Sequence, residues 1–291
     1  MRNYRTLLFV PAIKKKWVGK VACYKADGVI LDLEDSVPVQ SKTVARQNAA
    51  EAIPHMSAEG VHVFVRINRV TEFDENDLRA VIQPGLAGIV LPKLDGPEEI
   101  EELSALLDKL EEEKGLENGF VKLLPILETA KSMQLAYEIA CCDRVMGIAG
   151  LSAKNGDVAR ALGYQWTAEG LETLYMRSKV VMAARAAGVQ PIGGLWQDVH
   201  HLEGLKKSAS FNRRLGFVGE LILHPSHVSI VNDLYAPSEE DIEYYAGMVE
   251  AFEAAERNGE TAFMYRGEHI DYAHVKTARE VLAVAEQYTV K

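Results

Sequence analysis

Several features that would set a chain apart from ordinary globular proteins are missing from this sequence. No apolar run approaches the roughly 20 residues that a membrane-spanning helix needs. The segment Leu7–Ala12 is too short for a secretory signal core, and no small-residue cleavage site follows it. Only three of the 291 residues are cysteines, two of them adjacent (Cys141 and Cys142), which excludes a disulfide framework. These absences predict a cytoplasmic protein without a membrane partner.

Positive charge is also scarce. The chain carries 32 lysines and arginines against 42 aspartates and glutamates, a formal net charge of −10. Because nucleic-acid-binding domains usually present a basic face, this balance argues against nucleic acid as a partner. The 48% hydrophobic and 25% charged content exclude a disordered chain and predict a large buried core. The length fits one large domain or two small ones.

Short apolar segments, in contrast, recur along most of the chain. Most contain β-branched residues and are apolar on both faces, which is typical of parallel strands buried on both sides. Between them lie stretches with helical spacing, such as Ile100 through Leu110 with acids on the outside. The eight segments are Thr6–Pro11, Gly28–Leu33, His62–Asn68, Gly88–Lys93, Lys122–Glu128, Arg144–Ala149, Val189–Leu195 and Glu220–His224.

Eight strand–helix units are the number that closes a (β/α)8 TIM barrel. An open doubly wound sheet also alternates strands and helices. That fold more often carries a glycine-rich phosphate loop after its first strand, and Pro11-Ala12-Ile13 is not such a loop. We therefore predict an α/β protein whose residues 1–236 form a TIM barrel.

The pattern changes after Pro237. Ser238 opens a helix-start signature close to a capping box, and an amphipathic helix follows until Gly259. A short polar turn over residues 263–265 and a last amphipathic helix complete the chain. Because no linker rich in proline, glycine or serine precedes this part, we predict a C-terminal helical extension over residues 237–291. We expect it to contribute to a neighbouring subunit's site.

Polar residues gather where the predicted strands end. Active-site groups of TIM barrels lie at the C-terminal ends of the strands, so these residues are expected around one mouth. Each alone has an ordinary explanation, such as an ion pair or an acid in a first helical turn. Burying many charges together is costly without mutual pairing or a metal. The residues are Asp32, Glu34, Asp35, Arg66, Asn68, Lys93, Glu128, Asp157 and His224.

Three of these residues suggest a specific chemistry. Glu128 and Asp157 offer hard oxygen ligands from adjacent strands, and Mg²⁺ prefers one or two carboxylates together with waters and substrate oxygens. Arg66 offers a planar, permanently charged fork for a carboxylate or a developing oxyanion. Lys93 is the only strand-end lysine, and we interpret it as an ion-pair partner of nearby acids rather than as a Schiff-base nucleophile.

The strand-end motifs resemble those of the citrate lyase β-subunit-like branch of the HpcH/HpaI aldolase family. The sequence departs from the family pattern at Ala12, at Gly193, where an aspartate is usual, and at Asn155-Gly156 before Asp157. The departures leave the positions of the predicted metal ligands and arginine intact. The matching segments are Arg5–Pro11, Ile30–Val37, Val65–Asn68, Leu91–Lys93, Glu128–Ala130, Asp157 ahead of Leu162-Gly163, and His224–Ser226.

The resemblance implies a Mg²⁺-dependent carbon–carbon lyase, with Mn²⁺ as an alternative metal. It implies retro-Claisen cleavage of citramalyl-CoA, malyl-CoA or a citryl-type thioester to a keto acid and an acetyl thioester. Glu128 and Asp157 match the metal ligands, and Arg66 matches the oxyanion-stabilising arginine. Asp271, in an Ile-Asp pair, matches an acid/base that relatives supply across a subunit interface. A homotrimer or homohexamer is therefore expected.

The resemblance extends to the surroundings of the site. Asp32, Glu34 and Asp35 are expected to fix metal-bound waters and Arg66. The thioester carrier is coenzyme A or an acyl carrier protein, and both alternatives stay open. Coenzyme A needs cations for its phosphates, and three candidates for that contact are Arg5, Lys14 and Lys93. The alternative for Lys14 is that it belongs to a solvated lysine run on a helix face.

Two other enzyme activities fit the same residues. A hydroxyacyl-CoA thioesterase would use the same metal site for attack of water on the thioester carbonyl. A metal-dependent aldolase would act on free keto acids without a carrier. A scaffold without activity is the weakest alternative, because Glu128, Asp157 and Arg66 are all present.

Overall fold

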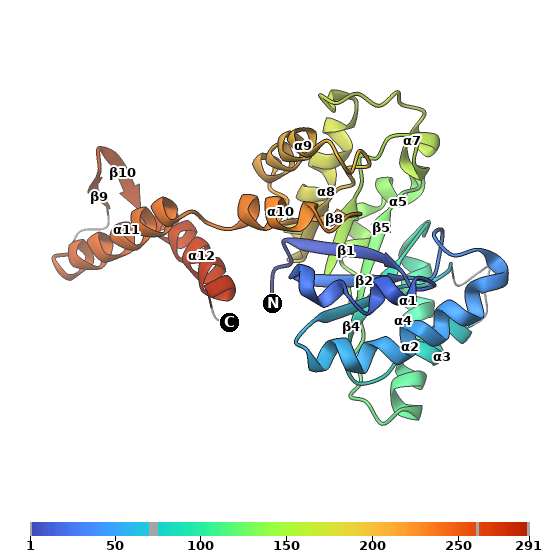
Figure 1. Ribbon diagram of the computed structural model, residues 1–291. Coiled ribbons are helices and arrows are strands. Elements are labelled where there is room, and N and C mark those ends of the chain that lie inside the picture. Colours follow the sequence, from blue (N-terminus) through green and yellow to red (C-terminus); the bar gives the residue numbers. More distant parts are fainter. Residues whose placement is uncertain (1, 70–74, 260–261, 290–291) are drawn as a thin grey trace. The chain divides into compact units, whose positions relative to one another are not determined.

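Eight parallel strands close into a barrel in the computed structural model, which describes residues 2–69, 75–259 and 262–289 (Figure 1). Each strand pairs with the next along the chain, and β1 also pairs with β8. The predicted TIM barrel is therefore confirmed. The strands are β1 (Thr6–Pro11), β2 (Gly28–Asp32), β3 (His62–Arg66), β4 (Leu86–Leu91), β5 (Lys122–Leu127), β6 (Gly147–Gly150), β7 (Gln190–Gly193) and β8 (Gly219–Ile222).

Each of the eight predicted segments overlaps one of these strands, but the ends differ. Most predicted segments run past the observed strand by one or two residues, so their polar residues lie just beyond the last hydrogen-bonded position. The largest difference is at β6, which begins at Gly147 instead of Arg144. Arg144 has a positive φ of 68° and therefore lies outside the extended region.

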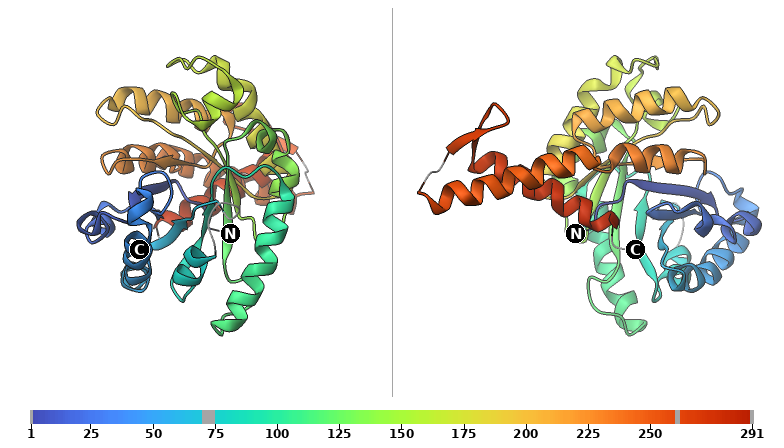
Figure 2. Two further views of the ribbon diagram at one scale, coloured as in Figure 1. Left: turned by 90° about the vertical axis from the view of Figure 1, so that its right-hand side faces the viewer. Right: turned by 60° about the vertical axis from the view of Figure 1, so that its left-hand side comes forward.

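Helices surround the barrel strands, as two further views show (Figure 2). The predicted apolar face of α4 is buried, including Ile100, Leu103 and Leu107. The helices of this part are α1 (Lys15–Val18), α2 (Lys42–Ala58), α3 (Asn76–Val81), α4 (Pro97–Glu113), α5 (Ala130–Gln134), α6 (Ala136–Ala140), α7 (Asp157–Leu162), α8 (Leu174–Ala187), α9 (Leu202–Leu215) and α10 (His227–Tyr235), with short 3₁₀ helices η1 (Val21–Tyr24), η2 (Val39–Ser41) and η3 (Leu171–Thr173).

The register of the parallel strands decides which strand-end residues become neighbours. Asp32, the last residue of β2, pairs in register with Arg66, the last residue of β3. Pro11 at the end of β1 is in turn level with Asp32. Because all strands run in one direction, their C-terminal ends meet at the same mouth of the barrel.

The chain divides into two compact units, one of residues 4–232 and a second that consists of residues 1–3 and 233–291. It contains α11 (Glu239–Arg257), β9 (Ala262–Tyr265), β10 (Glu268–Asp271) and α12 (Tyr272–Thr289). Ser238 caps α11 through a capping box, as its sequence indicates. The contribution of this unit to a neighbouring subunit's site stays a prediction. Within the described ranges, no helix combines the length and apolar character required to cross a bilayer.

The second unit has its own small core, and one local prediction for it was wrong. Phe252 and Ile270 are among its buried residues. Residues 263–265 were expected to form a polar turn, but they belong to β9, which pairs with β10 in an antiparallel hairpin. Arg266 and Gly267 connect the strands with positive φ angles of 48° and 91°. Two such residues make the tight turn that suits the twist of a hairpin.

A buried ion pair fixes the C-terminal end of α4 against the start of β5. Glu111 is fully buried and accepts hydrogen bonds from Arg144 and from the backbone N–H groups of Gly119 and Val121. Burial alone would raise the pKa of Glu111. The hydrogen bonds from Arg144 and from the backbone together lower it by more, so the pKa lies below its ordinary value of 4.5.

We expect Glu111→Gln to reduce the free energy of unfolding by about 1.5–3 kcal/mol at pH 7, because Arg144 loses its buried partner and keeps the half-exposed Asp108. A carboxylate with a lowered folded-state pKa stabilises the fold above pH 4.5 and loses that contribution as the pH falls through its folded pKa. The difference from wild type should therefore shrink between pH 7 and pH 3 in urea titrations. The exposed neighbour Glu112→Gln is the control. A difference that does not change with pH would contradict this explanation.

Candidate active site

The centre of the candidate site is a two-point ion pair between adjacent strand ends. Arg66 donates from Nε to Asp32 Oδ1 at 2.6 Å and from Nη2 to Asp32 Oδ2 at 2.8 Å. The two side chains are only 14% and 3% exposed. This fork-on-fork geometry is the strongest arrangement that an arginine and a carboxylate adopt. The register of β2 and β3 therefore produces a rigid, buried guanidinium.

Further contacts fix the same guanidinium. Glu34 Oε2 lies 3.0 Å from Arg66 Nη1, and the guanidinium carbon lies 4.9 Å from the ring centroid of Phe9 on β1. Burial by itself would raise the pKa of Asp32, but the hydrogen bonds and charge of Arg66 hold it below its ordinary value. Burial would lower the pKa of Arg66, but the bonds and charge of Asp32 raise it above the ordinary arginine value. Both groups are thus charged at neutral pH.

Lys93 gathers several of the other acids. It follows β4 in the left-handed conformation, with a φ of 51°. Its ammonium group bonds Glu34, lies 2.8 Å from Asp35 Oδ1 and lies 3.8 Å from Asp157 Oδ2. Burial would lower the pKa of Lys93, but the hydrogen bonds that it donates to Asp35 and Glu34 raise this pKa above its ordinary value. Lys93 is therefore a charged ion-pair partner of Glu34, Asp35 and Asp157 and not a free cation at the barrel mouth.

Glu128 is a buried carboxylate with little to neutralise it. It is 6% exposed, and the backbone N–H of Lys93, 2.8 Å from Oε1, is its sole hydrogen-bond donor within the part of the chain that the structure describes. Burial raises the pKa of Glu128 to about 7; the backbone N–H of Lys93 and the charge of Arg66 lower it, and the charges of Asp157 and Glu34 raise it. Glu128 therefore feels the charge of Arg66 but has, among the described residues, a single hydrogen bond, and a divalent cation would add the positive charge that its burial calls for.

Asp157 supplies the second carboxylate. It is the first residue of α7, and it forms ion pairs with Lys93 and Arg160. No group of three or more His, Cys, Asp or Glu side chains poised for a metal occurs among residues 2–69, 75–259 and 262–289. The pair Glu128 and Asp157 thus fits Mg²⁺, which takes one or two carboxylates and completes its shell with water and substrate, better than a closed protein cage.

A cavity of about 510 Å³ opens beside the ion pair. Asp32, Ser36 and Arg66 line its polar side, and the remaining wall is largely apolar, with Trp17 and His224 among its residues. The volume lies in the range of small-molecule sites. A ligand here would meet Arg66 with a negatively charged group and apolar side chains with the rest of its body.

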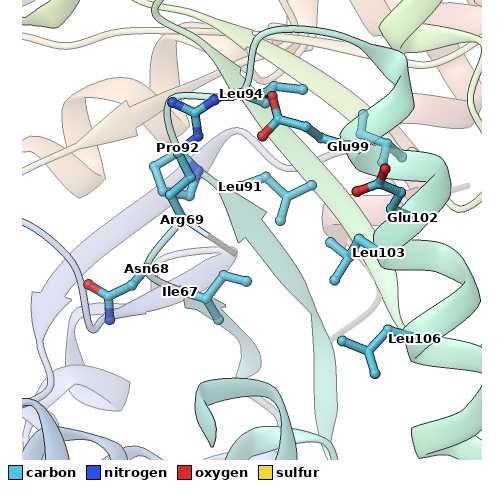
Figure 3. Close-up of a pocket in the computed structure, with 11 residues that line it drawn as sticks. Ile67, Asn68, Arg69, Leu91, Pro92, Leu94, Glu99, Glu102, Leu103 and Leu106 are labelled. Atoms are coloured by element: carbon cyan, nitrogen blue, oxygen red, sulfur yellow. Dashed lines mark hydrogen bonds and ion pairs between the residues drawn. The ribbon is translucent and has the colours of Figure 1, made fainter. Parts of the chain in front are cut away.

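A smaller cavity lies on the outer side of β4 against α4 and is shown in Figure 3. Its volume is about 80 Å³, well below that of an ordinary ligand site. Leu91 and Leu103 form part of its wall, and its arginine, Arg69, is paired with Asp95 and Glu99. We assign no binding function to it.

Three predicted site residues do not join this cluster. Arg5 precedes β1 and bonds Asp27 at 2.7 Å, just before β2 begins, so it lies at the opposite end of the barrel and we leave it out of the proposed site. Lys14 follows β1, is exposed and lies 5.9 Å from the ring centroid of Trp17, which lines the cavity. Asp271 belongs to the second unit, where His274 Nδ1 lies 2.7 Å from its Oδ1.

Two contributors to the site were missed by sequence reasoning. Lys42 donates to the backbone oxygens of Leu33 and Glu34 and to Asn68 Oδ1, each at 2.7 Å, and so fixes the loop that carries the acids. Phe9 lies beneath Arg66. Lys42 starts α2 directly after the short η2 helix and belongs to no periodic pattern. Phe9 is one apolar residue in a strand that is apolar on both faces.

Comparison with known proteins relates this geometry to a family. The family model described as HpcH/HpaI aldolase/citrate lyase matches residues 5–225. The chain is 33% identical to citrate lyase subunit beta of Escherichia coli strain K12, covering 98% of this chain and 94% of that protein. It is 30% identical to (3S)-malyl-CoA thioesterase of Cereibacter sphaeroides strain KD131, covering 97% and 95%.

Solved structures agree with these similarities. Protein CitE from Mycobacterium tuberculosis, in complex with magnesium, acetoacetate and coenzyme A, is 27% identical and superposes with a TM-score of 0.76, covering 98% of each chain. The citrate lyase beta subunit of the same organism, complexed with oxaloacetate and magnesium, gives a TM-score of 0.67 at 27% identity, covering 81% of this chain and 98% of that one. Strand order, strand-end residues and sequence similarity agree: the chain belongs to the HpcH/HpaI aldolase/citrate lyase family.

Proposed function

We propose that this protein is a Mg²⁺-dependent lyase that cleaves a carbon–carbon bond in a β-hydroxyacyl thioester. The observation that carries the proposal is the juxtaposition of Arg66, fixed by Asp32 at the cavity, with Glu128, a buried carboxylate whose pKa burial raises to about 7. The similarity to citrate lyase subunit beta and to CitE with magnesium, acetoacetate and coenzyme A supports it. Substrates of the citramalyl-CoA, malyl-CoA or citryl type fit this chemistry.

Glu128 and Asp157 are the proposed metal ligands. A magnesium ion, or manganese in its place, would supply Lewis acidity toward the hydroxyl and carboxylate oxygens of the substrate. Lys93 is placed to hold both carboxylates, since its backbone N–H donates to Glu128 and its ammonium group lies near Asp157. Glu34 and Asp35 in turn hold Lys93.

Arg66 is the proposed oxyanion-stabilising residue. In retro-Claisen cleavage the β-hydroxyl loses its proton and becomes the carbonyl of the keto acid. The electrons of the broken carbon–carbon bond move to the thioester as an enolate, which takes up a proton to give the acetyl thioester. A guanidinium whose position is already fixed by Asp32 stabilises the developing negative charge without reorganisation during the reaction.

Asp271 is the proposed acid/base, and a role in a neighbouring subunit's site would require an oligomer. It lies at the end of the β9–β10 hairpin with a half-exposed side chain beside His274. The hydrogen bond from His274 holds the pKa of Asp271 below its ordinary value, so it is an anion at neutral pH. We propose that it acts in a neighbouring subunit's site within a trimer or hexamer.

Coenzyme A is the carrier that we propose, with acyl carrier protein as the alternative. The solved CitE complex contains coenzyme A. Lys14 and Lys20 lie on the segment after β1, and Lys20 lines the cavity, where cations would meet the phosphates. Arg5 is at the far end of the barrel and takes no part in this contact.

A thioesterase is the second candidate function. The 30% identity with (3S)-malyl-CoA thioesterase over nearly the whole chain favours it. The same carboxylates and arginine would then serve the attack of water on the thioester carbonyl, and the carbon–carbon bond would remain intact.

A product analysis separates the candidates. We expect the protein with Mg²⁺ to convert one of a panel of hydroxyacyl-CoA thioesters to a keto acid, such as pyruvate or glyoxylate, plus acetyl-CoA, as identified by mass spectrometry. Free hydroxy acid plus free coenzyme A would identify a thioesterase instead. Turnover of free hydroxy acids without a thioester would identify a carrier-independent aldolase and contradict the lyase proposal.

Two substitutions separate metal binding from proton transfer. We expect Glu128→Gln to abolish Mg²⁺ binding in calorimetry and to lower kcat more than about 100-fold, whereas Asp271→Asn should lower kcat similarly and leave Mg²⁺ binding intact. The exposed Glu138→Gln is the matched control and should change neither. Full activity in excess EDTA would refute the metal requirement, and full activity of Asp271→Asn would remove Asp271 from the mechanism.

A further inference from the structure

A second large cavity lies in the barrel unit, between α8, α9 and the loops that follow β6 and β7. Its volume is about 390 Å³, within the range of small-molecule sites. Helices α8 and α9 contact each other and lie side by side in Figure 1. Leu195 borders both this cavity and the one beside Arg66, so the two are neighbours. None of the proposed catalytic residues lines it.

The floor of this cavity contains a buried cation without an ion-pair partner. Arg177 on α8 is 2% exposed, and the charges of Glu220 and Glu172 act on it without a direct ion pair in the described part of the chain. Its Nη1 donates to Asn212 Oδ1 at 2.9 Å, its Nη2 donates to the backbone oxygen of Gly170 at 2.5 Å, and Asn212 in turn donates to Glu220. Its Nε has no hydrogen-bond partner. Neutral oxygens thus supply its hydrogen bonds, and a bound anion would add the opposite charge that a buried guanidinium needs.

One face of α9 adds two more cations. Lys207, Phe211 and Arg214 follow one another at helical spacing and all line the cavity. Two guanidinium groups lie near the Phe211 ring, whose centroid is 4.6 Å from Arg177 and 5.9 Å from Arg214. Among the cavity residues only Glu169 carries a negative charge, against three cations. The charge of the wall therefore selects an anion.

Part of the cavity wall is aromatic. Trp166 and Trp196 both line the cavity, with ring centroids 5.9 Å apart. Their indole N–H groups are already used, donating to the backbone oxygens of Ser152 at 2.8 Å and Asp198 at 2.9 Å. These tryptophans therefore offer ring surface rather than hydrogen bonds, which suits a flat apolar group.

We propose that this cavity binds a small organic anion with a planar ring, whose acid group meets Arg177, Lys207 and Arg214 and whose ring packs against Trp166 and Trp196. Aromatic carboxylates and nucleoside monophosphates share this chemistry. The site lies apart from the proposed metal ligands, so its occupancy does not depend on the lyase activity.

The test is calorimetric titration of the full-length protein with three probes: adenosine 5′-monophosphate, benzoate and inorganic phosphate. We expect saturable binding of a ring-bearing probe, tighter than that of phosphate. The double variant Lys207→Ala with Arg214→Ala should weaken it about tenfold or more. The matched control is Lys206→Ala with Arg213→Ala, which removes the same charge from α9 at positions outside the cavity and should leave the Kd within about twofold.

Four results would overturn the proposal. The first three are the absence of saturable binding by both ring-bearing probes, equal weakening in the two double variants, and phosphate binding as tight as that of the ring-bearing probes. Displacement of the nucleotide by coenzyme A with no effect of Lys207→Ala and Arg214→Ala would place the binding at the cavity beside Arg66 instead. Mg²⁺ binding and thioester turnover of the same variants report separately on the proposed lyase.

Discussion

The pairing of Arg66 with Asp32 is the interaction on which the rest of the site depends. Parallel register brings the last residues of β2 and β3 level with each other, and the two side chains meet through two hydrogen bonds inside the barrel mouth. A guanidinium that is buried, permanently charged and fixed before a ligand arrives can stabilise an oxyanion without moving. Without Asp32, the same charge would be buried without its strongest partner.

The remaining charges are organised around this pair. Lys93 links Glu34, Asp35 and Asp157 by its ammonium group, while its backbone N–H reaches Glu128. The acids outnumber the cations that hold them, and Glu128 is the acid with the least compensation. A divalent cation between Glu128 and Asp157 would neutralise the remaining negative charge of these acids. The net charge of −10 therefore does not exclude an anionic substrate, because Arg66, and a metal ion held by Glu128 and Asp157, would make the local field at the cavity positive.

The apolar periodicity of the sequence predicted the strands and the end of the barrel at which the polar residues gather. All eight strands were found from their apolar segments, and their C-terminal ends place Asp32, Glu34, Asp35, Arg66 and Lys93 together because parallel strands share one mouth. What failed or was missed depends on three-dimensional detail. Arg5 stands next to a matching motif but precedes its strand, which puts it at the other end. The β9–β10 hairpin requires positive φ angles at two successive residues, Arg266 and Gly267. The contacts of Lys42 and the cavity beside α9 are formed by segments that are distant in the sequence.

In the proposed mechanism, Asp32 supports catalysis by fixing Arg66 and not by helping to bind the metal. The most direct measurement compares kcat and Mg²⁺ affinity of Asp32→Asn with those of Ser36→Ala, which removes a hydrogen bond to Asp32 without contacting Arg66. The account predicts that Asp32→Asn lowers kcat about 100-fold or more and leaves the Kd for Mg²⁺ within about twofold, whereas Ser36→Ala has a small effect on both. An unchanged kcat in Asp32→Asn, or a loss explained entirely by weaker Mg²⁺ binding, would contradict it.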